Sequence, residues 1–119
     1  MKLRSTLGAC LGALALVLSM TGSAQAAEGY FHYKYVDGYG QEQVVTLHDP
    51  ASGHCINLHA VGDDDALPGY GPHNQTDTPV TVYLGANCEG ASWRLKANGN
   101  PAKDTLELRS VRFGDPVVK

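Results

Sequence analysis

Residues 83–95 read Tyr-Leu-Gly-Ala-Asn-Cys-Glu-Gly-Ala-Ser-Trp-Arg-Leu, and this stretch is the clearest indication of the fold. Two β-prone runs, residues 80–84 and 92–96, flank a turn rich in small residues at 85–90. Short apolar and β-branched runs bounded by glycine and asparagine are typical of strands. We therefore expect two strands joined by a glycine-containing turn.

The rest of the chain beyond the N-terminal leader has the same character. An aromatic run ends at a turn over residues 37–40 and is followed by a second β-prone run, which predicts a hairpin. Residues 62–78, with three consecutive aspartates, two prolines and three glycines, are expected to form a long surface loop. No segment shows a sustained helical period. The predicted strands are 30–36, 43–48, 54–61, 80–84, 92–96 and 106–113, which together favour an all-β sandwich or Greek-key barrel.

The N-terminal segment, residues 1–26, has the three parts of a secretory signal peptide. Basic residues precede an apolar run over 7–20, and small residues stand before the expected cleavage after Ala26. The apolar run is shorter than the ~20 residues that span a bilayer. We expect residues 27–119 to form a single secreted, extracellular β domain without a membrane anchor.

The charge of this expected mature chain is negative. All twelve acidic residues but only seven of the nine basic residues lie after residue 26, which gives a net charge of −5. A negative domain is repelled by phosphate backbones and by anionic lipid surfaces. Nucleic acid and membranes are therefore not expected as partners.

Two cysteines, Cys55 and Cys88, remain after the leader. In an oxidising compartment they predict one intramolecular disulfide. The bridge would close a loop of about 34 residues, which contributes roughly 3–4 kcal/mol in the chain-entropy treatment. A reactive thiol pair is disfavoured because the Cys-x-x-Cys spacing is absent.

No motif predicts catalysis, a metal centre or a cofactor. Ser52 and Ser110 lie in no nucleophile elbow, and no local motif supplies a base. The carboxylates of residues 63–65 are interpreted as a solvated acidic loop, and the Asn74 sequon as ordinary turn residues. The histidines have no zinc-site spacing and are expected at the surface: His32, His48, His54, His59 and His73.

The start of the mature chain carries the strongest functional indication. On a strand, Phe31, Tyr33 and Tyr35 would share one face and Tyr30 would lie on the other. Two interpretations remain open. The segment 27–36 either serves as a core strand, or it presents aromatics to a partner, from one free face of the strand or as an extended segment. In the second case the four aromatics are its anchors.

The stretch quoted first resembles the signature hairpin of the βγ-crystallin Greek key. In that pattern an aromatic precedes a folded-over turn, a glycine follows seven residues later and an aromatic three beyond, as Tyr83, Gly90 and Trp93 do. Cys88 departs from the pattern, because a second aromatic is usual there. Residues 108–113 resemble the last strand of such a motif, and the first half of the chain matches only through Tyr33 and Gly40. The resemblance implies a small crystallin-like Greek-key sandwich.

Five short blocks, residues 29–33, 54–58, 74–77, 87–90 and 109–113, resemble small secreted crystallin-like proteins of Streptomyces-type bacteria. Within that group the chain is similar to the adaptor subunit of umbrella toxin particles. The resemblance implies a non-catalytic, protein-binding adaptor that links a lectin subunit to the stalk of a large repeat-containing antibacterial toxin subunit. It also implies that Tyr30, Phe31, Tyr33 and Tyr35 dock into the lectin subunit.

Two other functions are alternatives to the adaptor. The chain also resembles crystallin-like metalloproteinase inhibitors of the same bacteria, but those are expected to use two disulfides and only one is possible here. A small hydrolase would need a convergent site that the sequence does not display.

Overall fold

The structure is a computed structural model that describes residues 26–114. The expected signal peptide therefore lies outside the described residues, apart from Ala26. The strands are β1 (Gly29–Val36), β2 (Glu42–His48), β3 (Cys55–Asn57), β4 (Gly69–Thr76), β5 (Val80–Tyr83), β6 (Ser92–Leu95), β7 (Glu107–Leu108) and β8 (Ser110–Phe113). A short 3-10 turn, η2 (Ala86–Cys88), lies between β5 and β6.

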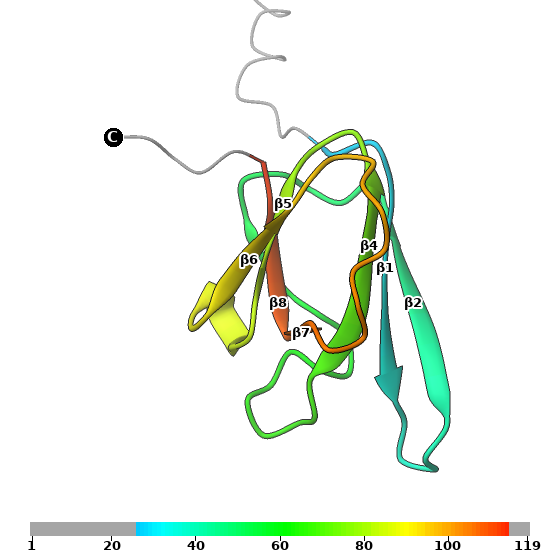
Figure 1. Cartoon of the computed structure of the whole chain (residues 1–119). Helices are drawn as coiled ribbons and strands as arrows, with labels where there is room; N and C mark the ends of the chain where they lie inside the picture. The colour runs from blue at the N-terminus through cyan, green and yellow to red at the C-terminus, as the bar shows by residue number, and fades with distance from the viewer. Residues whose placement is uncertain (1–25, 115–119) are drawn as a thin grey trace, which may run out of the picture.

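The strands form two four-stranded sheets that face each other (Figure 1). The first sheet has the order β2-β1-β4-β7 and the second the order β3-β8-β5-β6. Every paired strand runs antiparallel to its neighbour. The expected all-β, sandwich-like architecture is confirmed.

The two halves of the chain follow the same path. In the first half β1 lies between β2 and β4, and β3 crosses to the second sheet beside β8. In the second half β5 lies between β6 and β8, and β7 crosses to the first sheet beside β4. Each half thus contributes its third strand to the sheet of the other half, which makes neither half a complete unit by itself.

The expectation of a surface loop over residues 62–78 is wrong in its second half. Residues 69–76 form β4, an inner strand of the first sheet. Its glycine and proline are accommodated at a register shift in the pairing with β1, where Gly71 has a φ of 60°. Proline is tolerated at such bulges because no ladder hydrogen bond is required of it there. The carbonyl of Pro72 accepts a hydrogen bond from the Ala102 amide at 2.9 Å.

Two further strand boundaries differ from the expected ones. The third strand covers only Cys55–Asn57, because Leu58 and Val61 leave the sheet and pack into the core. The last predicted strand divides at Arg109 into β7 and β8, which belong to different sheets. The Arg109 guanidinium donates to the carbonyls of Asp63, Leu84 and Ala66. It thereby holds the loop after β3 against the point where the chain passes from β7 to β8.

The core lies between the sheets and consists of the inward-facing residues of both. Phe31 of β1 packs edge-on against Phe113 of β8, with ring centroids 5.4 Å apart. Alternate residues of the strands point inward, as strand geometry requires. The fully buried apolar residues are Ala27, Phe31, Tyr33, Val80, Val82, Leu108 and Val111, with Leu58, Val61 and Phe113 almost so.

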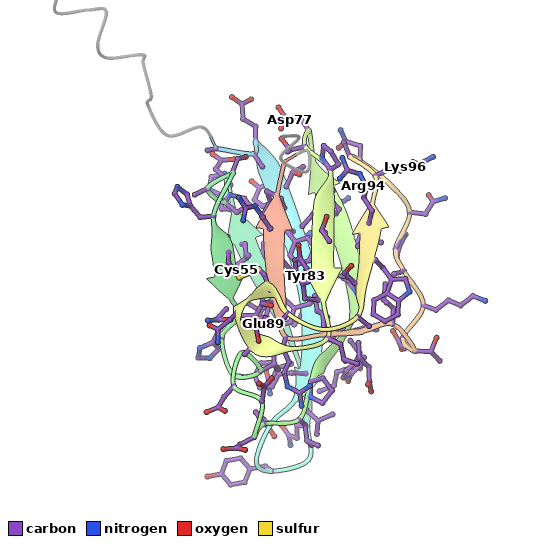
Figure 2. All side chains as sticks on the ribbon, turned by 90° about the vertical axis from the view of Figure 1, so that its left-hand side faces the viewer. Cys55, Asp77, Tyr83, Glu89, Arg94 and Lys96 are labelled. Atoms are coloured by element: carbon purple, nitrogen blue, oxygen red, sulfur yellow. A yellow bond between two sulfur atoms is a disulfide. The ribbon has the colours of Figure 1, made fainter. Side chains whose placement is uncertain are left out.

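The turn between β5 and β6 folds back over the outer face of the second sheet. Figure 2, which looks onto this sheet, shows the turn carrying Glu89 crossing in front of the strands. Cys88 forms the expected disulfide with Cys55, with Cα atoms 5.9 Å apart. The buried Ser110 hydroxyl donates to the Gly85 carbonyl at 2.6 Å and accepts from the Cys88 amide at 2.8 Å. Gly90 has a φ of 87°, which glycine adopts without side-chain cost.

Replacing Ser110 by alanine is expected to loosen this turn. The change leaves the Gly85 carbonyl and the Cys88 amide without their partner, and each unsatisfied group costs about 1–3 kcal/mol where water cannot replace the hydroxyl. We expect a loss of about 2 kcal/mol in the free energy of unfolding, measured by urea denaturation. Ser92→Ala, at an exposed position of β6, is the control and should change it by less than about 0.5 kcal/mol. Equal effects of the two changes would contradict this role of Ser110.

No helix within residues 26–114 is long and apolar enough to cross a membrane.

Candidate functional site

The four aromatics predicted as partner anchors divide between the two faces of β1. Phe31 and Tyr33 are fully buried in the core, and the half-buried Tyr35 packs against it. Tyr30 lies on the outer face and is 49% exposed. In the structure this segment is a core strand and not an extended arm, because β1 pairs with β2 on one side and with β4 on the other. Presenting Phe31 or Tyr33 to a partner would require β1 to leave the sheet.

Tyr33 is held by a hydrogen bond as well as by packing. Its hydroxyl donates to the His59 carbonyl at 2.8 Å. Burial raises the pKa of Tyr33 to about 12, with a smaller contribution from the neighbouring Tyr35. Because the folded state retains the proton that the unfolded chain loses near pH 10, this contribution to stability is complete below pH 10 and disappears as the pH rises towards 12.

We therefore expect alkaline destabilisation between pH 10 and 12. A single tyrosine with this shift lowers the free energy of unfolding by up to about 1.4 kcal/mol per pH unit in that window. Urea denaturation at a series of pH values measures the slope. Tyr33→Phe should make the slope clearly shallower, and an unchanged slope in that variant would rule out Tyr33 as its source.

The outer face of the first sheet gathers two tyrosines and three histidines, which we call the tyrosine–histidine face: Tyr30, His32, His48, Tyr70 and His73. Strand register places Tyr30 opposite His48 and His32 opposite His73. The Tyr30 and His48 rings stack with centroids 4.9 Å apart, and the His32 and His73 rings lie 5.9 Å apart. Three strands thus contribute rings to this one face.

Hydrogen bonds fix the centre of this face. His32 Nδ1 lies 2.8 Å from the Thr46 hydroxyl oxygen, and His32 Nε2 lies 2.8 Å from Gln75 Oε1. Because an amide oxygen only accepts, Nε2 carries the proton. Both ring nitrogens are therefore occupied across three strands. The His32 ring is thereby held in one orientation at the surface.

A row of polar contacts borders the face at its other end. The Tyr70 hydroxyl donates to Glu42 Oε2 at 2.7 Å, and this hydrogen bond raises the pKa of Tyr70 to about 12. Lys34 Nζ lies 2.7 Å from Asp104 Oδ1, and that hydrogen bond raises the pKa of the lysine. The Lys34 ammonium also lies 5.5 Å from the centre of the Tyr70 ring. A side chain at Gly71 would come within 2.5 Å of the Asp104 carboxylate, so the glycine leaves space for this row.

Two of the three consecutive aspartates and the asparagine of the sequon have structural partners. Asp64 accepts from the Ala86 amide, and Asp63 accepts from the Asp65 amide, so two of the three consecutive carboxylates order their own loop and the turn over the second sheet. The Asn74 side chain is buried and donates to the carbonyls of Thr78 and Lys96. Within residues 26–114 no three histidine, cysteine or acidic residues are grouped to hold a metal ion.

The sequence did not point to His48, Tyr70 and His73 as one surface. They come from β2 and β4, and the second of these strands was expected to be a loop. The only sequence signal was the alternation of Tyr30, His32 and Lys34 on the face of β1 opposite Phe31 and Tyr33. That alternation shows which face of β1 is polar and aromatic but not which strands lie beside it.

The fold and this face define the protein as a small antiparallel β sandwich with one disulfide and an open, ring-lined sheet surface. No known family, curated protein or solved structure matches the chain.

Proposed function

We propose that this protein is a secreted, non-catalytic binding module that holds another protein against the tyrosine–histidine face. The observation that carries the proposal is the preorganised surface of rings on the first sheet, with Tyr30 stacked on His48 and with the His32 and His73 rings side by side. Tyrosine is favoured at protein interfaces because it offers a large contact area with few rotatable bonds. The outer face of the second sheet is partly covered by the turn at residues 84–91, which leaves the first sheet as the more open surface.

Stacking also favours a protein over a flat ligand as the partner. One face of the Tyr30 ring is turned towards His48, with the planes inclined by only 17°. That face is not available to a sugar or another planar ring. A protein surface can instead contact the ring edges and the polar groups between them, as mixed aromatic and polar interfaces do.

The strand order supports a finer proposal, a βγ-crystallin-like Greek-key fold. Two halves with equivalent paths, each contributing one strand to the other sheet, and a folded-over turn at Gly90 are features that this proposal requires. Within it, we propose the adaptor role that the sequence resemblance implies, with a lectin subunit and a large repeat-containing toxin subunit as partners. Tyr30 replaces the buried Phe31 and Tyr33 as the proposed anchor.

A matched pair of variants tests the binding face. Tyr30→Ala removes a 49% exposed ring from this face, and Trp93→Ala removes a 44% exposed ring from the edge of the second sheet. Tagged chains are used to capture partners from the culture fluid of the source organism, and the purified partner is then titrated. We expect Tyr30→Ala to weaken binding at least tenfold and Trp93→Ala to leave it within about twofold.

The same experiment separates the other functions. Co-purification of large secreted subunits supports the adaptor, whereas stoichiometric loss of protease activity supports the crystallin-like inhibitor. Turnover of a model ester by the purified chain would contradict a non-catalytic module. Equal binding by the two alanine variants would show that the partner does not use the tyrosine–histidine face.

A further inference from the structure

Strand β2 forms a long open rim of the first sheet. It spans seven residues and, within residues 26–114, pairs with β1 alone (Figure 1). The other outer strands, β3, β6 and β7, have three, four and two residues. Natural edge strands are usually protected by lysine, proline, bulges or a covering segment. β2 contains no lysine, proline or glycine, and its register with β1 is unbroken.

The register shows which backbone groups face the open rim. The amide of Asp37 donates to the Gln41 carbonyl, and the amide of Asp49 donates to the Gly29 carbonyl. In an antiparallel ladder the hydrogen-bonded pairs alternate, so the backbone groups of Gln43, Val45 and Leu47 point towards β1. The amides and carbonyls that point outward are those of Glu42, Val44, Thr46 and His48.

This rim is complementary to itself. If two copies pair antiparallel about Val45, each Glu42 stands opposite a His48 and each Val44 opposite a Thr46, as hydrogen-bonded pairs. On the inner face Gln43 stands opposite Leu47. No like charges stand directly opposite each other, and all four outward residues of each copy find partners.

We propose that β2 is a self-association edge, through which two copies of this chain join their first sheets into one continuous eight-stranded sheet. We infer that a second copy occupies the rim, because β2 is complementary to itself. When two copies pair about Val45, all seven residues of each strand are used, and Glu42 of one copy faces the imidazole of His48 in the other. Glu42 already accepts from Tyr70, and His48 Nε2 already lies 3.4 Å from Asp49 Oδ2. A carboxylate offers further acceptor sites, and the imidazole has a second ring nitrogen. Val45 and Leu47 are half-buried at the rim of the core. In the dimer Val45 becomes covered by Val45 of the second copy, and Leu47 by its Gln43.

The geometry also has a consequence for binding. Because residues paired across strands lie on the same side of a sheet, the outer faces of both copies lie on one side of the joined sheet. The two tyrosine–histidine faces then form a single surface. Self-association itself does not depend on the proposed function, since it requires no other partner.

Cysteine variants test the register. Only residue 45 stands opposite itself, as a pair with Cα atoms about 4.5 Å apart, within the range that a disulfide spans. Gln43→Cys points to the same inner face, but its two copies would lie about 13 Å apart along the strands. We expect Val45→Cys to form a covalent dimer under mild oxidation and Gln43→Cys to remain monomeric. Peptide mapping verifies that Cys55 and Cys88 stay paired.

Sedimentation equilibrium with Val44→Pro tests the backbone contacts. The Val44 amide points to the open rim and its side chain is 64% exposed, so proline removes an intermolecular donor while the ladder to β1 remains. Two intermolecular hydrogen bonds are lost per dimer, and we expect the dissociation constant to rise roughly thirtyfold. The melting curve of the variant confirms folding.

Three results would overturn the proposal: a wild-type chain that stays monomeric to about 1 mM, unchanged association of folded Val44→Pro, or equal cross-linking of the two cysteine variants. Failure of the binding face is distinguishable from these. A Val44→Pro monomer that still captures its partner through Tyr30 supports the proposed function without the dimer. A dimeric chain that captures no partner would support self-association and contradict the proposed function.

Discussion

Replacing Phe31 by alanine is expected to lower the free energy of unfolding by about 3–5 kcal/mol, the range for a large buried aromatic truncated in a close-packed core. Phe31 has no exposed surface and contacts the rings of both Phe113 and Tyr33. Since small domains are stable by only about 5–15 kcal/mol, this single change removes a large share of the total. Thermal and urea denaturation of the purified variant measure the loss.

Tyr30→Ala is the matched control for Phe31→Ala, because the two residues are adjacent on β1 and point to opposite faces. We expect it to cost less than about 1 kcal/mol, since half of the ring is already in water. This pair of variants also tests the core-strand arrangement of the N-terminal aromatics in solution. A folded, stable Phe31→Ala chain that has lost partner capture would contradict the core role and favour a segment extended to a partner.

Removing the Cys55–Cys88 disulfide is the second change with a large expected effect. The bridge joins outer strand β3 to the folded-over turn across 33 positions of sequence. Without it, the unfolded chain gains conformational freedom equivalent to roughly 3–4 kcal/mol in the chain-entropy treatment. We expect the double variant Cys55→Ala/Cys88→Ala to lose about this much stability in urea denaturation.

A reducing agent provides the control for the disulfide. Dithiothreitol should destabilise the wild-type chain to nearly the level of the double variant and should leave the double variant unchanged. Equal stability of the oxidised and reduced wild-type chains would show that Ser110 and the packed core hold the turn without the bridge. The Ser110→Ala variant, which keeps the disulfide, separates the two contributions.

The proposed site was only partly predictable. Alternation along β1 placed Phe31, Tyr33 and Tyr35 on one face and Tyr30 on the other, and the structure has this arrangement. Which face meets the core could not be decided, because both faces carry aromatic rings. The choice depends on what lies above each face, and Phe113 comes from the far end of the chain.

The residues themselves determined the all-β class and the disulfide. Both follow from local chemistry: β-prone runs between glycine and asparagine turns, and two cysteines after a predicted export signal. These properties need no knowledge of distant contacts. The hairpin of β1 and β2 was predictable for the same reason, since its strands are neighbours in sequence.

Tertiary structure alone decided that β4 is an inner strand of the first sheet, that β3 and β7 each join the sheet of the other half, and that β2 lies at an open edge. Residues 69–76 read as a loop because glycine and proline weaken a strand in isolation, yet β1 and the chain around residue 102 satisfy the backbone there. Strand pairing joins residues far apart in sequence, and its energy depends on which edges meet. That is why the ring-lined face becomes visible only once the sheets are assembled.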